Sequence, residues 1–154
     1  MIYTFNEQDI YYMKEALAEA QLAVLHGDVP VGAVMVKDRQ IIGRGHNRRE
    51  VDQDPTAHAV ILALRQAGRH FGDWRLSGTH LYVTLEPCPM CASAIVQAKL
   101  EQVTYGVADT RLGAAGSLLT LLQFPGFHHD TLIRSGLLME ECRDLLSNFF
   151  SDKR

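Results

Sequence analysis

Cysteine is scarce in this chain, with three among 154 residues, and two of them lie close together. An odd count with one tight pair, Cys88 and Cys91, does not fit the disulfide framework of a small secreted domain. A chain of this length can bury a hydrophobic core without such bridges. We therefore expect a cytoplasmic protein, because thiols stay reduced there and can bind metal.

Long hydrophobic runs and an excess of basic charge are also missing. No apolar stretch approaches the roughly 20 residues that cross a bilayer, and the first residues lack the basic and apolar regions of a signal peptide. We therefore expect no membrane partner. The net charge of -3 argues against non-specific coating of nucleic acid but allows a local basic patch. Since repeats and linkers are absent from the sequence, one domain over residues 1–154 is predicted.

The hydrophobic pattern predicts alternating helices and strands. Asn6 is a good N-cap for a first helix with one apolar face, and Gly27 is its expected stop. Further helices are predicted over 57–67 with Gly68 as the stop, through 90–98 with Pro87 in its first turn, over 117–122 and over 140–150. Strands are predicted over 31–36, 41–45, 80–85, 102–107 and 131–133. This order predicts an α/β fold, a three-layer α/β/α sandwich around a mixed sheet of about five strands.

Metal-binding chemistry is indicated by Cys88 and Cys91. Cysteines three apart at a helix start share one face, and the helix dipole favours their thiolates. Such a pair is half of a zinc site, although beside a strand–helix–strand pattern it also fits a redox motif. His58, at the start of the preceding predicted helix, favours metal, because a redox pair has no use for a distant histidine. Three ligands leave the fourth position open to water, as in catalytic sites, so we predict one Zn²⁺ per chain. Cys142 is interpreted as a buried apolar residue of the last helix.

Four segments resemble the bacterial tRNA adenosine deaminases, a family of zinc-dependent enzymes. They are residues 29–34, 54–59, 81–88 and 113–117. The resemblance extends over nearly the whole chain. It implies a cytidine deaminase-like fold, a homodimer, and a tRNA anticodon stem-loop as partner. The implied reaction is hydrolysis of the wobble adenosine to inosine.

The resemblance also implies roles for individual residues. Asn47 would hold the target nucleoside by hydrogen bonds, and Val29 and Leu85 would wall the flipped base. Backbone groups near Ala59 and Glu86 would read the edge of the base. Without the resemblance, Val29 and Leu85 would be interpreted as ordinary core and Asn47 as a turn residue.

The loop after the strand predicted at 102–107 would meet the RNA itself. By the same resemblance, Asp109 and its neighbours would contact the RNA backbone or flanking nucleotides. Basic residues that could bind phosphate, Arg48 and Arg49 among them, are scattered along the chain. Each alone is most simply a solvated surface charge.

One position departs from the family pattern. The family has His-Ala-Glu where this chain has His58-Ala59-Val60. That glutamate is the general acid/base and not a zinc ligand, and valine has no ionisable group. We therefore expect zinc and RNA binding to survive and turnover to be abolished or strongly impaired. Glu86 is the first candidate for a substitute acid, although a structural role for it is favoured.

Two other functions are compatible with this sequence. The first is deamination of a free nucleobase, guanine or cytosine, and binding of an anticodon stem-loop would distinguish it from tRNA editing. The second is a non-catalytic pseudoenzyme that binds RNA or pairs with an active subunit, as the valine at position 60 would allow.

Overall fold

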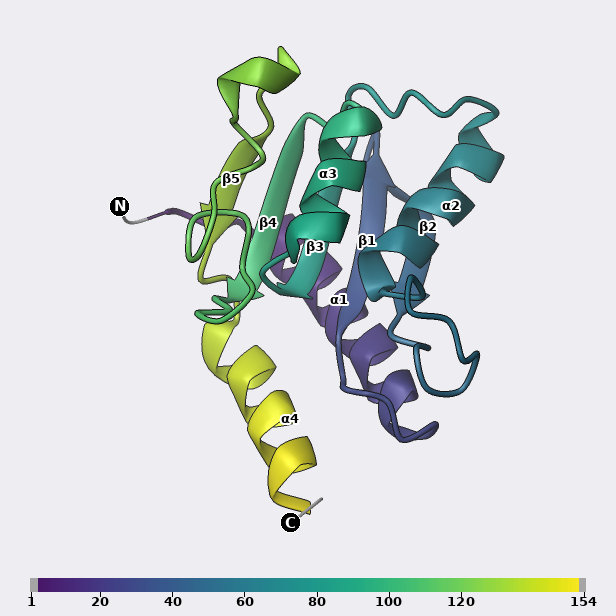
Figure 1. The fold of residues 1–154 in the computed structure, drawn as a ribbon, viewed down its shortest axis with the longest axis vertical. Coiled ribbons are helices and arrows are strands. Elements are labelled where there is room, and N and C mark those ends of the chain that lie inside the picture. The colour runs from purple at the N-terminus through teal and green to yellow at the C-terminus, as the bar shows by residue number, and fades with distance from the viewer. Residues whose placement is uncertain (1–2, 153–154) are drawn as a thin grey trace.

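The computed structural model describes residues 3–152, so residues 1–2 and 153–154 of the predicted domain lie outside the described part. Five strands form one mixed sheet in the order β2-β1-β3-β4-β5 (Figure 1). They are β1 (Gly32–Lys37), β2 (Gln40–His46), β3 (His80–Leu85), β4 (Gln102–Val107) and β5 (Leu132–Ser135). Strand β1 pairs antiparallel with β2 and β3, whereas β3, β4 and β5 run parallel. The crossover that was predicted from the strand, helix and strand order is thus confirmed.

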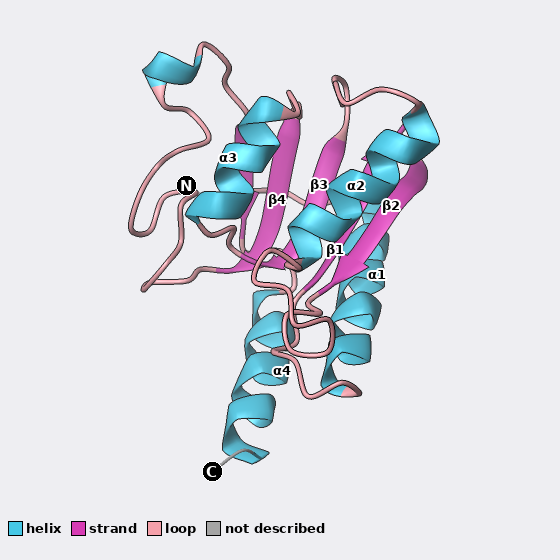
Figure 2. Ribbon diagram, turned by 45° about the vertical axis from the view of Figure 1, so that its right-hand side comes forward, coloured by secondary structure: helices cyan, strands magenta, loops and turns pink. Residues whose placement is uncertain are grey.

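Helices cover both faces of the sheet. They are α1 (Glu7–Val24), α2 (Ala59–Phe71), α3 (Pro89–Gln97) and α4 (Met139–Asp152), with a short 3₁₀ helix η1 (Pro125–Phe127). Helices α2 and α3 lie on one face, and α1 and α4 belong to the other (Figures 1 and 2). The predicted α/β/α sandwich is confirmed. Within residues 3–152, no helix combines the length and the apolar character that a bilayer span requires.

Alternation along the strands separates two core layers. On β1, Ala33 and Met35 pack with the residues of α2 and α3, whereas Val34 and Val36 pack with those of α1. Cys142 of α4 is buried in the second layer, as predicted. Its thiol therefore lies on the face of the sheet opposite to α2 and α3.

The helix ends follow local backbone chemistry, and three predictions about them are wrong. Helix α1 ends at Val24 with Leu25 as its C-cap, before the predicted stop at Gly27. Asn6 caps α1 through a capping box with Asp9, as predicted for the cap. Helix α2, however, continues past Gly68 to Phe71, and its C-cap is Gly72, whose φ of 76° is left-handed. A glycine inside a helix costs only about 1 kcal/mol, and the left-handed position is the one that needs glycine. In α3 the first-turn proline is Pro89 and not the predicted Pro87.

The predicted helix over 117–122 is also wrong. This segment forms turns, with an isolated bridge between Ala115 and Thr120 and a φ of 133° at Gly116. The amide and the hydroxyl of Ser117 both donate to the buried carboxylate of Glu86. Hydrogen bonds to Glu86, which directly follows β3, therefore override the helical sequence pattern of this segment.

Glycines on β2 let α2 approach the sheet very closely. A Cβ added at Gly45 would lie 2.8 Å from the amide nitrogen of Ala63 and would overlap the carbonyl oxygen of Ala59. Since Ala59 is the first residue of α2, this contact fixes the start of the helix. The same contact holds the helix backbone that directly follows His58.

Gly45→Ala should therefore lower the free energy of unfolding by about 1–3 kcal/mol, because the new methyl group overpacks against helix backbone. Gly68→Ala is the matched control, because a Cβ there meets its nearest neighbour, the Asp73 carbonyl oxygen, at an ordinary 3.5 Å. That variant should be as stable as the parent or more stable by up to about 1 kcal/mol. Urea unfolding of both proteins gives the comparison, and equal stability of Gly45→Ala and the parent would contradict the close packing.

The chain segments that contain the candidate site residues meet at one edge of the sheet. The first residue of β1, Gly32, pairs with the last of β2, His46, and the last residues of β3 and β4, Leu85 and Val107, pair with each other. The amino ends of α2 and α3 lie at this same edge (Figure 2). Residues that follow β2, β3 and β4 therefore meet there.

Candidate metal centre

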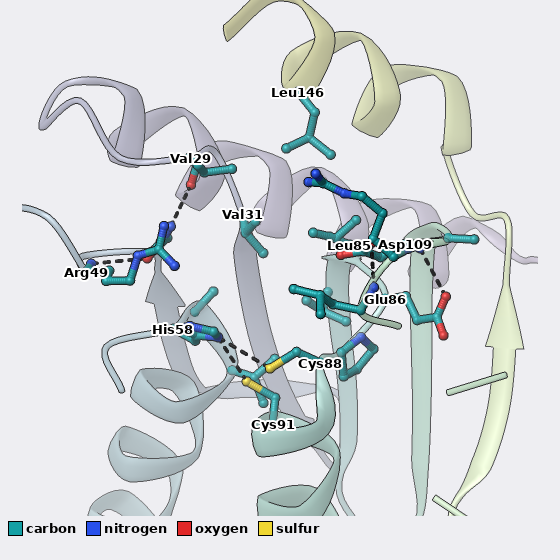
Figure 3. Close-up of a pocket in the computed structure, with 18 of the residues that line it drawn as sticks. Val29, Val31, Arg49, His58, Leu85, Glu86, Cys88, Cys91, Asp109 and Leu146 are labelled. Carbon is teal, nitrogen blue, oxygen red and sulfur yellow. Dashed lines mark hydrogen bonds between the residues drawn. The ribbon is translucent and has the colours of Figure 1, made fainter. Parts of the chain in front are cut away.

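The three predicted metal ligands converge at this edge. His58 is the N-cap residue of α2 and Cys88 that of α3, and neither side chain caps its own helix. Cys91 follows within the first turn of α3 and is 2% exposed. The Nδ1 atom of His58 lies 3.6 Å from the Sγ atom of each cysteine (Figure 3). The structure thus brings together residues that are 30 and 33 positions apart in the chain.

This arrangement fits a zinc ion. Tetrahedral zinc with ordinary Zn–N and Zn–S bonds separates an imidazole nitrogen from a thiolate sulfur by about 3.6 Å. The distances from His58 to both thiols match that value, and all three ligand atoms lie within 4.8 Å of one another. The amino ends of two helices point at the site, so their dipoles favour thiolates there.

Cys88 and Cys91 differ in acidity because they share a hydrogen bond. The pKa of Cys88 is lowered to about 4, chiefly because the Cys91 thiol donates to it and further because His58 stabilises its thiolate. The pKa of Cys91 is raised, since Cys91 keeps the proton that it donates and is buried beside that negative charge. The shared hydrogen bond therefore shifts the pKa values of the two thiols in opposite directions.

A cavity of about 480 Å³ opens beside the three ligands, which is a size suited to a small organic ligand. All the residues to which a role was assigned from the sequence line it, namely Val29, Asn47, His58, Ala59, Val60, Leu85, Glu86, Cys88, Cys91 and Asp109. Apolar side chains make up much of the wall. The structure therefore places every predicted site residue around one space.

Asn47 lines this cavity with its amide group held at both ends. Its Nδ2 donates to the Val29 carbonyl at 3.2 Å, and its Oδ1 accepts from the Arg49 amide at 3.1 Å. The side chain is 8% exposed. Asn47 can therefore both stabilise the loop and bind a ligand, so its two interpretations are compatible.

The buried Glu86 has both carboxylate oxygens occupied. Its Oε1 accepts from the Asp109 amide at 3.1 Å and from the Ser117 hydroxyl. Its Oε2 accepts from the amides of Ala115 at 2.9 Å and Ser117 at 3.0 Å. A carboxylate with four donors fastens the loop 109–117 to the end of β3, which is the structural role favoured from the sequence.

Val60 lies in the first turn of α2, two residues after His58. It is 3% exposed, packs in the core layer beneath α2 and α3, and lines the cavity. An apolar side chain therefore stands at the amino end of this helix, where the dipole would favour an acid.

Sequence analysis missed Leu146, which lines the cavity from α4. Phe150 of the same helix also lines it, whereas the sequence leaves Phe150 open between a core position and a surface for base stacking. Arg111, a neighbour of Asp109, lines it from the loop after β4. The four-residue spacing of Leu146 and Phe150 marks one helix face. The spacing alone does not predict that this face borders the cavity, because the position of α4 depends on its packing on the sheet.

Comparison with known sequences identifies the family. Residues 6–107 match the family described as the cytidine and deoxycytidylate deaminase zinc-binding region. The chain is 49% identical over 147 residues to the tRNA-specific adenosine deaminase of Bacillus subtilis, covering 96% of this chain and 91% of that protein. It is 43% identical to the tRNA-specific adenosine deaminase of Haemophilus influenzae, covering 97% and 87% of the two chains.

Solved structures agree with the sequence comparison. A structure from the tRNA:A34 deaminases, which carry out A-to-I editing at the wobble position of transfer RNA, matches with a TM-score of 0.85 and 42% identity over 88% of this chain and 99% of that chain. Guanine deaminase from Bacillus subtilis matches less well, with a TM-score of 0.63 and 38% identity over 73% and 71% of the two chains. The chain therefore belongs to the zinc-binding cytidine and deoxycytidylate deaminase family and, within it, to the tRNA-specific adenosine deaminases.

Proposed function

We propose that this site is built to deaminate the wobble adenosine of a tRNA anticodon to inosine. The observation that carries the proposal is the group of His58, Cys88 and Cys91 beside a cavity of about 480 Å³. The high identity to tRNA-specific adenosine deaminases over nearly the whole chain supports this substrate in preference to a free base.

The reaction adds water to C6 of the purine, breaks the bond between C6 and the exocyclic amine, and releases that amine as ammonia, which leaves the C6 carbonyl of inosine. Zinc, when bound by the three ligands, lowers the pKa of water to about 7 and so supplies a nucleophile. The residues of the chain bind and orient the nucleoside. Asn47 keeps one N–H and one lone pair for hydrogen bonds to it, because each end of its amide has a single protein partner among the described residues. Val29 and Leu85 contact the base, and backbone groups near Ala59 and Glu86 read its edge.

The site lacks a proton carrier at position 60. A general acid/base there takes a proton from the attacking water and delivers protons to the purine ring and the leaving amine. Val60 can do neither, and Glu86 is occupied by four hydrogen bonds. The Oδ1 atom of Asp109 accepts hydrogen bonds from the amides of Arg111 and Leu112. The chain with valine at position 60 therefore still binds zinc and RNA but does not catalyse deamination.

The RNA partner is an anticodon stem-loop. Arg49 and Arg111 line the cavity and supply positive charge for the phosphates beside a bound nucleotide, while Asp109 contacts the RNA nearby. Such a partner, together with thiols that must stay reduced to bind zinc, favours action in the cytoplasm.

The chain acts as a homodimer, as the resemblance implies. Large apolar side chains are exposed over one segment after β4, namely Leu112, Leu118, Leu119, Phe124 and Phe127. Exposed apolar side chains, where they form a contiguous patch, are typical of a protein–protein interface.

An anticodon stem-loop with adenosine at the wobble position should bind to the chain as written, because the phosphate and base contacts do not involve position 60. With about three phosphates contacted, affinity should fall roughly twenty- to fortyfold between 50 and 200 mM salt. Fluorescence anisotropy of a labelled stem-loop measures both effects. Free guanine and free cytosine are the comparison ligands, and binding of either one without binding of the stem-loop would contradict the proposal.

A free nucleobase deaminase is the second candidate, favoured by the structural likeness to guanine deaminase. The binding experiment distinguishes it from tRNA editing. A non-catalytic RNA-binding protein is the third candidate, and it differs from the first in whether activity returns when an acid is restored at position 60.

A further inference from the structure

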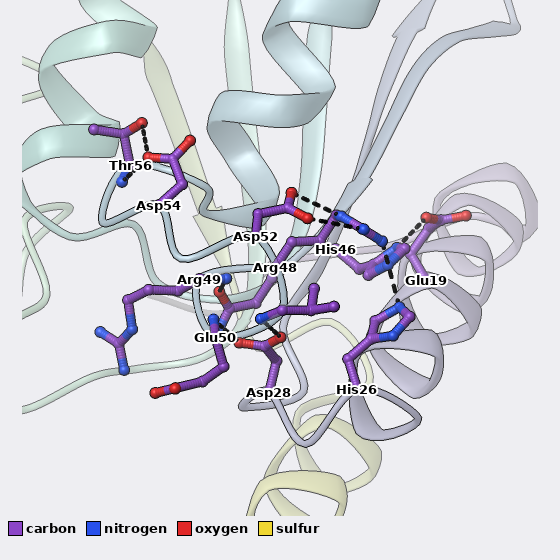
Figure 4. Close-up of polar contacts among 12 residues, drawn as sticks. Glu19, His26, Asp28, His46, Arg48, Arg49, Glu50, Asp52, Asp54 and Thr56 are labelled. Atoms are coloured by element: carbon purple, nitrogen blue, oxygen red, sulfur yellow. Dashed lines mark hydrogen bonds and ion pairs between the residues drawn. The ribbon is translucent and has the colours of Figure 1, made fainter.

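Asp28 is a fully buried acid in the short connection between α1 and β1. Burying a carboxylate is costly unless hydrogen bonds replace its water. Each of its oxygens accepts one backbone amide, from Glu50 at 2.6 Å and from Val51 at 3.2 Å (Figure 4). Asp28 therefore holds a turn that is more than 20 positions further along the chain.

That turn belongs to the loop 47–56, which joins β2 to α2 and brings Asn47 and Arg49 to the cavity. The connection that contains Asp28 contacts this loop at two more points. The Val29 carbonyl accepts from the Asn47 side chain at 3.2 Å, and the Val31 carbonyl accepts from the Asn47 amide at 3.0 Å. The residues 28–31 thus act as a support for the loop.

A chain of contacts leads from Asp28 to the Asn47 side chain. Asp28 fixes the amides of Glu50 and Val51, and the backbone of Arg49 directly precedes them. The Arg49 amide in turn donates to Oδ1 of Asn47 at 3.1 Å. The direction in which the Asn47 amide presents its oxygen and nitrogen therefore depends on the turn that Asp28 holds.

We infer that Asp28 is a positioning residue, which holds Asn47 and Arg49 in the orientation that receives the nucleoside. The inference rests on the proposed function for the identity of that nucleoside. Asp28 itself is not among the described residues that line the cavity, so it acts through the loop.

An acid within the loop 47–56 itself, Asp52, provides a matched control. Asp52 binds the Arg48 guanidinium through two hydrogen bonds of 2.9 Å at the surface, and its side chain is 38% exposed (Figure 4). Arg48 also approaches His26 at 3.4 Å. Exposed pairs of this kind contribute little to stability. Asp52→Asn removes the same charge as Asp28→Asn but leaves the amides of Glu50 and Val51 with their acceptor.

The decisive measurement is a ratio of two affinities. One ligand is the anticodon stem-loop with adenosine at the wobble position, and the other is the same stem-loop with an abasic site there. The ratio reports the contribution of the cavity and cancels both the phosphate contacts and the fraction of folded protein. Asp28→Asn should lower this preference for adenosine about tenfold or more, because its amide nitrogen faces a backbone donor. Asp52→Asn should leave the preference unchanged, and zinc content should be equal in all three proteins. A preference in Asp28→Asn equal to that of the parent would overturn the inference.

Amide hydrogen exchange provides a test that needs no RNA. Asp28→Asn should speed exchange at Glu50 and Val51 and in the adjoining loop, whereas Asp52→Asn should not affect these two amides. Unchanged protection at the two amides, or a loss spread over the whole chain, would overturn a local positioning role. A parent chain that binds no stem-loop would count against the proposed function alone, and the exchange result would still decide the role of Asp28.

Discussion

Val60→Glu should raise the rate of deamination by at least about 10²–10⁴-fold, the usual contribution of one positioned proton transfer. The expected gain lies at or beyond the upper end of that range, because one carboxylate would serve several transfers in sequence. The new side chain would stand in the first turn of α2 and line the cavity two residues after His58. The helix dipole favours an acid at this position, which limits the cost of replacing a buried valine.

A single-turnover inosine assay on proteins of matched zinc content measures this gain. Val60→Gln is the control, because it has nearly the size and polarity of the glutamate variant but cannot carry a proton. It should stay inactive, and RNA affinity should change by only a small factor in both variants. If the parent proved as fast as Val60→Glu, another acid would have to carry the protons. Glu86 would be the first suspect, and it would have to leave four hydrogen bonds to act.

Cys88→Ser should reduce bound zinc from one per chain to a small fraction of that, because a serine hydroxyl is a poor replacement for a thiolate. Zinc is measured by elemental analysis of protein purified without added metal. Cys142→Ala is the matched control and should keep its zinc, since Cys142 is buried in the core layer formed with α1. Tightly bound zinc that survives Cys88→Ser would refute the assignment of the ligands and would reopen the redox interpretation of the cysteine pair.

Local and spacing signals predicted most of the fold and the metal centre. The residues 33–36 form an apolar run because both faces of β1 are buried in core layers, and such a run is visible in any single sequence. The ligands were predictable because zinc needs particular side chains at particular helix positions. Their distances of 3.6 Å required a structure, since they depend on how α2 and α3 pack on the sheet.

The errors came from interactions that no local pattern records. The segment 117–122 has helical spacing, but the carboxylate of Glu86, about thirty positions earlier, binds Ser117 and holds the chain in turns. Gly68 resembles a helix stop, yet the left-handed position falls at Gly72. The role of Asp28 was equally hidden, because its partners at Glu50 and Val51 are backbone amides and have no side-chain signature.

The anchoring of the loop 109–117 by Glu86 separates the parts of that loop that tolerate change from those that do not. Residues 113–115 are buried, and a Cβ at Gly113 would overlap the Glu86 carboxylate. Residues 110–112, in contrast, are exposed and line the cavity. Altered substrate ranges could thus evolve, or be selected in the laboratory, by replacing three side chains at the rim. The backbone beneath them and the neighbouring Cys88, a predicted metal ligand, would stay in place.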